Sequence, residues 1–183
     1  MVAGLARFRD LVDFSLPLSA AAQLPSWQQP KTLLFALAVA MPLASWGWSA
    51  LLNNFVIEVG GFDGVGIGWL HTIREIPGFL AVGVLAFLLF FHEQVFGLIA
   101  LFVLGAAIAV TAWFPSMAGI LTVTLISSIG FHYFETVNQS LQVQWISKAD
   151  APRALGLLTA AGAGSGLFAY GIILTGTQVF NSC

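Results

Sequence analysis

The side chains best suited to chemistry in this sequence lie within long apolar stretches. One stretch carries a polar stripe that consists of Thr124, Ser128, His132, Glu135 and Gln139. At about 100° of rotation per residue in a helix, these five side chains fall within an arc of about 80°. His132 and Glu135 both titrate, so this pair could relay protons or bind a polar solute. A structural pair satisfied by hydrogen bonds fits the same pattern, as interhelical hydrogen bonding does for Thr124 and Ser128.

A second polar stripe lies nearer the N-terminus. Ser45, Ser49 and Asn53 recur at a spacing of four, Asn54 stands beside them, and Glu58 follows Asn54 by four residues. Two adjacent amides followed by a carboxylate favour a face that binds a solute. A packing face of small residues is the alternative, and Ser45 and Ser49 fit it well.

Arg74 is the third feature, together with Glu75 beside it. An ionised side chain at the centre of a membrane helix costs roughly 2.5–3.5 kcal/mol on insertion scales, so Arg74 requires a partner or a wet cavity. Glu58, Asp63 and Glu75 are the candidate partners. We expect a rim or gate ion pair between Arg74 and Asp63 or Glu75, with recognition of an anionic solute as the alternative.

Composition identifies the environment in which these residues act. Of 183 residues, 58% are hydrophobic and 8% are charged, with a mean hydropathy of +0.93. A soluble domain is nearer about 45–50% apolar and about 25% charged, so the sequence predicts a membrane protein. A net charge of −2 excludes a basic surface for nucleic acid. The single cysteine, Cys183, excludes a disulfide framework and a cysteine metal site.

Five apolar segments are long enough to cross about 30 Å of hydrocarbon as helices. They cover about 33–57, 67–91, 95–113, 117–139 and 155–179. The period-2 alternation of barrel strands is absent, so we expect an all-α, polytopic transmembrane helical bundle. Short connections make sequential helices antiparallel neighbours. The longer, polar link at 140–154 is expected to lie along the membrane surface.

The first 30 residues are expected to form a cytoplasmic arm, and residues 31–183 the bundle. Within the arm, Leu5, Phe8, Leu11 and Val12 recur at helical spacing, which predicts an amphipathic interfacial helix. A secretory signal is the alternative, although Asp10 interrupts its apolar core.

Basic residues set the expected orientation. They precede the first segment or separate the fourth from the fifth, and they are Arg7, Arg9, Lys31, Lys148 and Arg153. The loops after the first and third segments contain no Lys or Arg, so the N-terminus is expected in the cytoplasm and the C-terminus outside the plasma (inner) membrane.

The fifth segment is rich in glycine. Gly162 and Gly166 form a G-x-x-x-G pair, which permits close approach to another helix. Ala163-Gly164-Ser165-Gly166 falls one residue short of the G-x-S-G signature of rhomboid intramembrane proteases, whose base His132 could supply. The helix count is too low for that family, so we expect no enzyme. No further His, Cys or carboxylate residue accompanies His132 and Glu135 at a spacing suited to metal binding. Neither a metal nor another cofactor is therefore expected.

The arrangement resembles the N-terminal half of a major facilitator superfamily transporter, from about Lys31 to Phe180. The resemblance lies in the short hairpins, the basic link before the fifth segment and the glycine-rich segment after Arg153. It implies that the first and fourth helices line a central cavity. It therefore places Asn53, Asn54, Glu58, His132, Glu135 and Gln139 on a translocation pathway, with Arg74 at its rim. The implied function is secondary transport of a small solute by alternating access, with coupling to protons through Glu135, His132 or Glu58.

Transporters of that family have twelve helices in two halves, and five fit here. The expected partners are thus the lipid bilayer, a small-molecule solute, and a missing C-terminal half or partner chain. Without the latter, the chain is expected not to transport as a monomer. The alternative is a non-transporting membrane interaction or assembly subunit.

Overall fold

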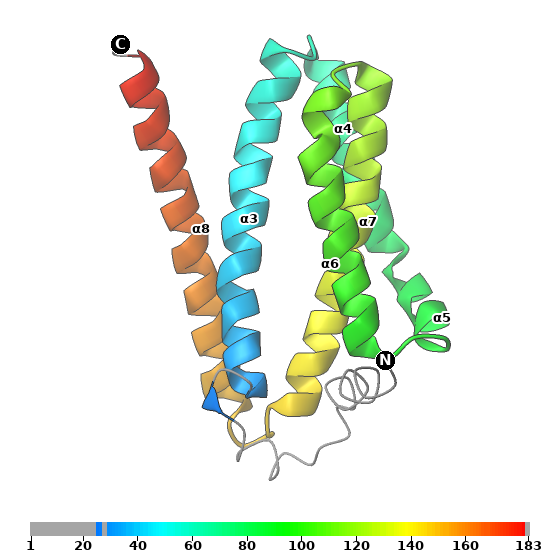
Figure 1. Cartoon of the computed structure of the whole chain (residues 1–183), viewed down its shortest axis with the longest axis vertical. Coiled ribbons are helices and arrows are strands. Elements are labelled where there is room, and N and C mark those ends of the chain that lie inside the picture. The colour runs from blue at the N-terminus through cyan, green and yellow to red at the C-terminus, as the bar shows by residue number, and fades with distance from the viewer. Residues whose placement is uncertain (1–24, 27–28, 182–183) are drawn as a thin grey trace, which may run out of the picture.

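The computed structural model describes residues 25–26 and 29–181, and every regular element within them is a helix (Figure 1). The elements are α3 (Pro30–Glu58), α4 (Gly64–Phe79), a 3₁₀ turn (Ala81–Gly83), α5 (Val84–Leu88), α6 (Glu93–Val110), a second 3₁₀ turn (Thr111–Trp113), α7 (Met117–Trp145) and α8 (Ala151–Asn181). The expected all-α bundle is confirmed. The amphipathic helix expected in the N-terminal arm and Cys183 lie outside the described residues.

Five helical spans are long and apolar enough to cross a membrane, which makes this a membrane-embedded protein. Large apolar side chains cover the outside of the bundle, as Phe79, Leu89 and Phe102 illustrate with more than three quarters of their surface exposed. Such a surface is unfavourable in water and favourable against lipid tails. The apolar exterior and the span lengths therefore point to the same environment.

The link between the fourth and fifth spans is much shorter than expected. α7 continues to Trp145 and α8 begins at Ala151, so the prediction of a surface segment over residues 140–154 is wrong. Two polar residues of that segment, Ser140 and Gln144, instead bond to the start of α6. The Ser140 hydroxyl lies 3.2 Å from Glu93 Oε1, and Gln144 Nε2 donates to Glu93 Oε2 at 2.7 Å.

The second span is interrupted, whereas the sequence suggested a continuous helix. Pro77 lies in the last turn of α4, where it provides no N–H and its ring crowds the carbonyl one turn earlier. α4 ends at Phe79, and the 3₁₀ turn and α5 complete the span. Pro42, by contrast, is accommodated within the continuous α3.

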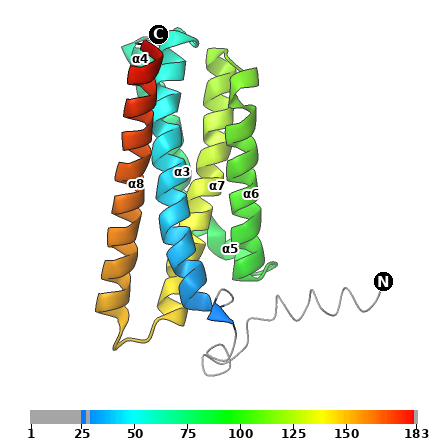
Figure 2. The same ribbon diagram turned by 60° about the vertical axis from the view of Figure 1, so that its left-hand side comes forward.

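The spans form two groups. α3 pairs with α8, while α7 pairs with both α6 and α4, and the contact between α3 and α7 is much less extensive. Figures 1 and 2 show α3 beside α8 and α6 beside α7 from two directions. α3 and α8 begin at the same end of the bundle, so Lys31, Lys148 and Arg153 gather there, as the sequence predicted.

Glycines set the closest approaches between helices. Gly162 and Gly166 of α8 face α3, so the predicted role of this pair is confirmed. A Cβ on Gly162 would lie 3.1 Å from the Ala38 carbonyl oxygen, and one on Gly166 would overlap the Trp46 ring. On α7, a Cβ on Gly130 would come within 2.7 Å of the Ala100 carbonyl oxygen on α6.

We expect Gly130→Ala to destabilise the bundle because its methyl group would meet α6 backbone, which cannot turn away as a side chain could. Overpacking of this kind costs about 1–3 kcal/mol. Gly105→Ala, on α6 with open space around its Cβ, is the matched control and should leave stability unchanged. Thermal unfolding in detergent measures both, and equal midpoints for the two variants would contradict the prediction.

Candidate functional site

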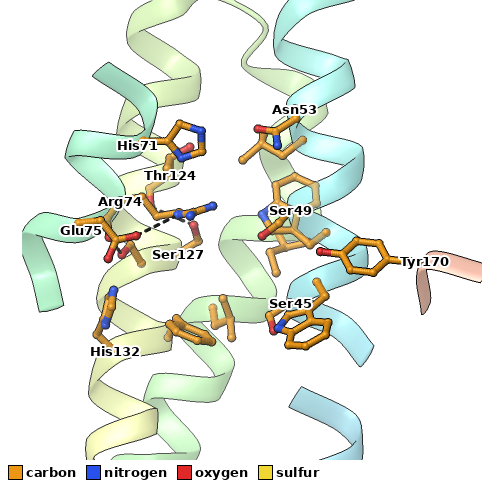
Figure 3. Close-up of a pocket in the computed structure, with 17 residues that line it drawn as sticks. Ser45, Ser49, Asn53, His71, Arg74, Glu75, Thr124, Ser127, His132 and Tyr170 are labelled. Carbon is orange, nitrogen blue, oxygen red and sulfur yellow. Dashed lines mark hydrogen bonds and ion pairs between the residues drawn. The ribbon is translucent and has the colours of Figure 1, made fainter. Parts of the chain in front are cut away.

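A cavity of about 440 Å³ lies between the two helix groups, within the membrane-spanning part of the bundle (Figure 3). Its polar lining comes from three helices. These residues are Ser45, Ser49 and Asn53 of α3, His71, Arg74 and Glu75 of α4, and Thr124, Ser127, Ser128 and His132 of α7. Leu104 and Ile108 of α6 and Tyr170 of α8 complete the wall together with aromatic side chains.

α3 contributes one continuous polar face. Ser45, Ser49 and Asn53 repeat every fourth residue, so they lie above one another along the helix and all reach the cavity. The Ser45 hydroxyl donates to the Met41 carbonyl oxygen at 2.7 Å, one turn earlier on the same helix. The stripe that the sequence left open between packing and binding therefore faces a space.

α4 places Arg74 at the centre of the polar lining. Its Nε lies 3.4 Å from Glu75 Oε1, and the two side chains are 37% and 55% exposed. The Ser128 hydroxyl of α7 donates to the Arg74 main-chain carbonyl oxygen. This hydrogen bond fixes the backbone of Arg74 against α7, while the side chain extends into the cavity toward α3 (Figure 3).

α7 contributes hydroxyls and an imidazole. The Ser127 hydroxyl donates to the Thr124 carbonyl oxygen at 3.0 Å. His132 meets Phe131 edge-on, with ring centroids 5.3 Å apart, and lies against Gly78 of α4. A Cβ on Gly78 would come within 3.0 Å of His132 Cε1, so this glycine makes room for the imidazole.

Aromatic rings form the opposite wall. Trp46 of α3 stacks on Tyr170 of α8, with ring centroids 5.9 Å apart and an interplanar angle of 27°. Trp48 and Phe131 also line the cavity. The cavity thus combines hydrogen-bonding groups from α3, α4 and α7, the ionised Arg74 on α4, and flat aromatic surface on α3 and α8, a combination typical of small-molecule sites.

The structure brings four of the predicted site residues to the cavity: Asn53, His132, Arg74 and Glu75. Asn54 and Glu58 are exposed, and neither belongs to the lining. Glu135 and Gln139 are also outside it, where Gln139 Nε2 lies 3.4 Å from Glu135 Oε1.

Asp63 occupies a different place from the rim pair expected for it. Its carboxylate accepts a hydrogen bond from the Gly66 N–H at 2.8 Å and so caps the start of α4. Glu75 is the residue that pairs with Arg74.

Several lining residues escaped the sequence analysis as site candidates, Ser127 and Tyr170 among them. Ser127 had a signal, because it stands between Thr124 and Ser128 of the polar stripe. Tyr170 had none, since it reaches the cavity only through the packing of α8 on α3.

Ser165, the residue of the protease-like motif, lies apart from the cavity lining. Its side chain is buried, and the hydroxyl donates to the Gly162 carbonyl oxygen at 2.9 Å within α8. Among the described residues, no group of three or more His, Cys, Asp or Glu side chains is arranged to hold a metal ion.

No protein-family model, curated protein or solved structure matches this chain. Function must therefore be inferred from the cavity and its surroundings.

We expect Gly166→Ala to reshape the aromatic wall because the new methyl group occupies the position of the Trp46 ring, which must turn away from Tyr170. Near-ultraviolet circular dichroism should lose the signal that Trp46→Phe also removes. Gly164→Ala, two residues away with open space around its Cβ, should keep the original spectrum. A Gly166→Ala spectrum identical to that of the unchanged protein would disprove the close contact.

Proposed function

We propose that this protein moves a small solute across its membrane by alternating access, with the cavity between α3, α4 and α7 as part of the pathway. The observation that carries the proposal is a cavity of about 440 Å³ with ionisable side chains inside a membrane-spanning bundle. Pockets for small molecules are typically about 300–1,000 Å³, so the space suits a solute. Ionisable residues at membrane depth mark substrate and ion pathways more often than structural cores.

Packing alone does not account for this arrangement. Polar side chains that only join helices would meet one another and leave no space, since protein interiors are close-packed. Here Ser49, Asn53 and His71 face a common void instead. A space lined by hydrogen-bonding groups at membrane depth suits water or a polar solute, which a packing face would not need.

The division into two helix groups supports a rocking motion. α3 and α8 form one unit, and α4, α6 and α7 form the other, with limited contact between α3 and α7. Secondary transporters alternate by rigid-body rocking of such units around a site near the midplane.

Two apolar clusters flank the cavity along the bundle axis and would serve as the gates of this motion. The first contains Leu52, Val56, Phe62, Leu70 and Ile120, near the end of α3. The second contains Leu34, Val84, Phe96, Val137, Leu141 and Trp145, near its start. Each cluster joins the α3 group to the α7 group, so opening one while the other stays closed would expose the cavity to one side only.

Membership in the major facilitator superfamily remains part of the proposal. Its support is that α3 and α7, the first and fourth spans, both line the cavity. On this interpretation the chain is the N-terminal bundle, its basic end faces the cytoplasm, and a further half or partner chain completes the pathway, so motion of the two helix groups would accompany rocking of the two halves. His132 is then the strongest candidate for proton coupling, because Glu58 and Glu135 lie outside the lining.

Thiol labelling tests alternating access without knowledge of the solute. In a Cys183→Ser background, we expect Ser49→Cys to react with a membrane-impermeant thiol reagent added from either side, because the cavity opens to each side in turn. Leu51→Cys, two residues away on the exposed apolar surface of α3, is the matched control and should react from neither side. Reaction of Ser49→Cys from one side alone would exclude alternating access.

The second candidate is an assembly subunit, and the outer face of α8 favours it. Gly156, Ala160 and Gly164 repeat every fourth residue and are exposed, and both glycines have open space around them. Stripes of small residues allow helices to associate in membranes.

We expect Gly164→Leu to release any partner helix held there while leaving the labelling of Ser49→Cys unchanged, because the substitution lies away from the cavity. Crosslinking in membranes followed by sizing of the complexes measures this. A pure assembly subunit would instead show loss of complexes together with Ser49→Cys that reacts from one side at most.

A further inference from the structure

The residues that line the cavity carry no excess of negative charge. Four lining side chains are ionisable: His71, Arg74, Glu75 and His132. One carboxylate therefore faces one guanidinium and two imidazoles, which are neutral or positive. A cationic solute would meet Arg74 at close range, and the one carboxylate of the lining, Glu75, is already paired with that guanidinium.

Arg74 also has hydrogen-bonding capacity to spare. A guanidinium carries five N–H donors, and the pair with Glu75 uses the one on Nε. At 3.4 Å this contact is longer than the roughly 2.7–2.9 Å of a strong charge-assisted bond. Among the described residues, no side chain accepts from the terminal amino groups of Arg74. These two groups form the fork that matches a carboxylate or phosphate.

The surroundings hold this fork in place. The hydrogen bond from Ser128 anchors the Arg74 backbone to α7, and Figure 3 shows the guanidinium extending across the cavity toward Ser49. His71 and His132 lie to either side of it along the bundle axis and offer further N–H donors (Figure 3). Glu75 pairs with Arg74 and is more than half exposed, so its side chain has room to move away.

The rest of the cavity suits the body of such a ligand. Trp46 and Tyr170 present stacked rings, and Trp48 and Phe131 extend the apolar wall. Flat apolar groups pack favourably on such surfaces. The polar and aromatic sides together describe a ligand with an anionic group at one end and an apolar or aromatic body at the other.

We infer that the solute is a small organic anion, with its anionic group on the Arg74 fork and its body against Trp46 and Tyr170. This inference rests on the proposed function for the identification of the cavity as a solute site. Two classes of ligand fit this description, carboxylates with a planar anionic group and phosphate esters with a tetrahedral one. Both carry the anionic oxygens on an apolar body.

Calorimetric titration of the purified full chain in detergent tests the inference with four probes that share one ring. Benzoate and phenyl phosphate are anionic, benzamide is neutral, and benzylamine is cationic at neutral pH. We expect at least one anion to bind about tenfold or more tightly than benzamide and benzylamine, since hydrogen bonds to charged groups contribute about 1.5–3 kcal/mol. Which of the two anions binds more tightly distinguishes a carboxylate site from a phosphate site.

Arg74→Gln should abolish this preference by weakening the binding of both anions to the level of benzamide, and its thermal unfolding in detergent shows that the variant still folds. Arg74→Lys keeps the charge but loses the fork and should fall between the two. Arg153→Gln is the matched control, because it removes a positive charge from the start of α8, outside the cavity. It should bind all four probes as the unchanged protein does.

The inference is overturned if neither anion binds more tightly than benzamide, or if the preference survives Arg74→Gln. Its failure is distinguishable from failure of the proposed function. If Ser49→Cys labels from both sides and the protein shows no preference for anions, the transport proposal stands and the anion inference fails. If the preference is lost in Arg74→Gln and Ser49→Cys labels from one side only, the anion site stands and the transport proposal fails.

Discussion

Arg74 lies in a membrane-spanning helix, where hydrocarbon cannot replace the water that solvates a guanidinium. Every neighbouring feature follows from keeping that group out of lipid. α4 turns it inward, Ser128 of α7 holds its backbone carbonyl, and Glu75 provides a counter-charge at 3.4 Å. The side chain then requires a polar space to enter, and the cavity between α3, α4 and α7 is that space. The charged residue and the cavity are two aspects of one constraint.

The close contacts that surround the cavity do not arise from hydrophobicity, because lipid tails are as apolar as the side chains they would replace. They arise from backbone approach at glycines. Gly130 brings α7 onto α6, and Gly162 and Gly166 bring α8 onto α3. Gly166 also has a second consequence, since the Trp46 ring fits over it and stacks there on Tyr170. The same glycine that joins two helices therefore shapes the aromatic wall of the cavity.

The proposed transport and the proposed anion recognition are linked through the position of the cavity between two helix groups. Arg74, on α4, belongs to one group, whereas Trp46 and Tyr170, on α3 and α8, belong to the other. A ligand that touches both would connect the groups across the space that separates them. Its binding would then favour the arrangement in which the two walls lie closest, which is how a ligand shifts a conformational equilibrium.

The sequence alone determined the number and kind of the spans and the faces within each helix. Span length and composition predicted the five helices, and helical periodicity placed Ser45, Ser49 and Asn53 on one side of α3. Tertiary structure decided which faces meet. The pairing of α8 with α3 brings Tyr170 to the cavity, and hydrogen bonds to Glu93 together with apolar packing hold α7 from Ser140 to Trp145. Periodicity acts within one helix, whereas a cavity depends on contacts between residues far apart in the chain, which local pattern does not encode.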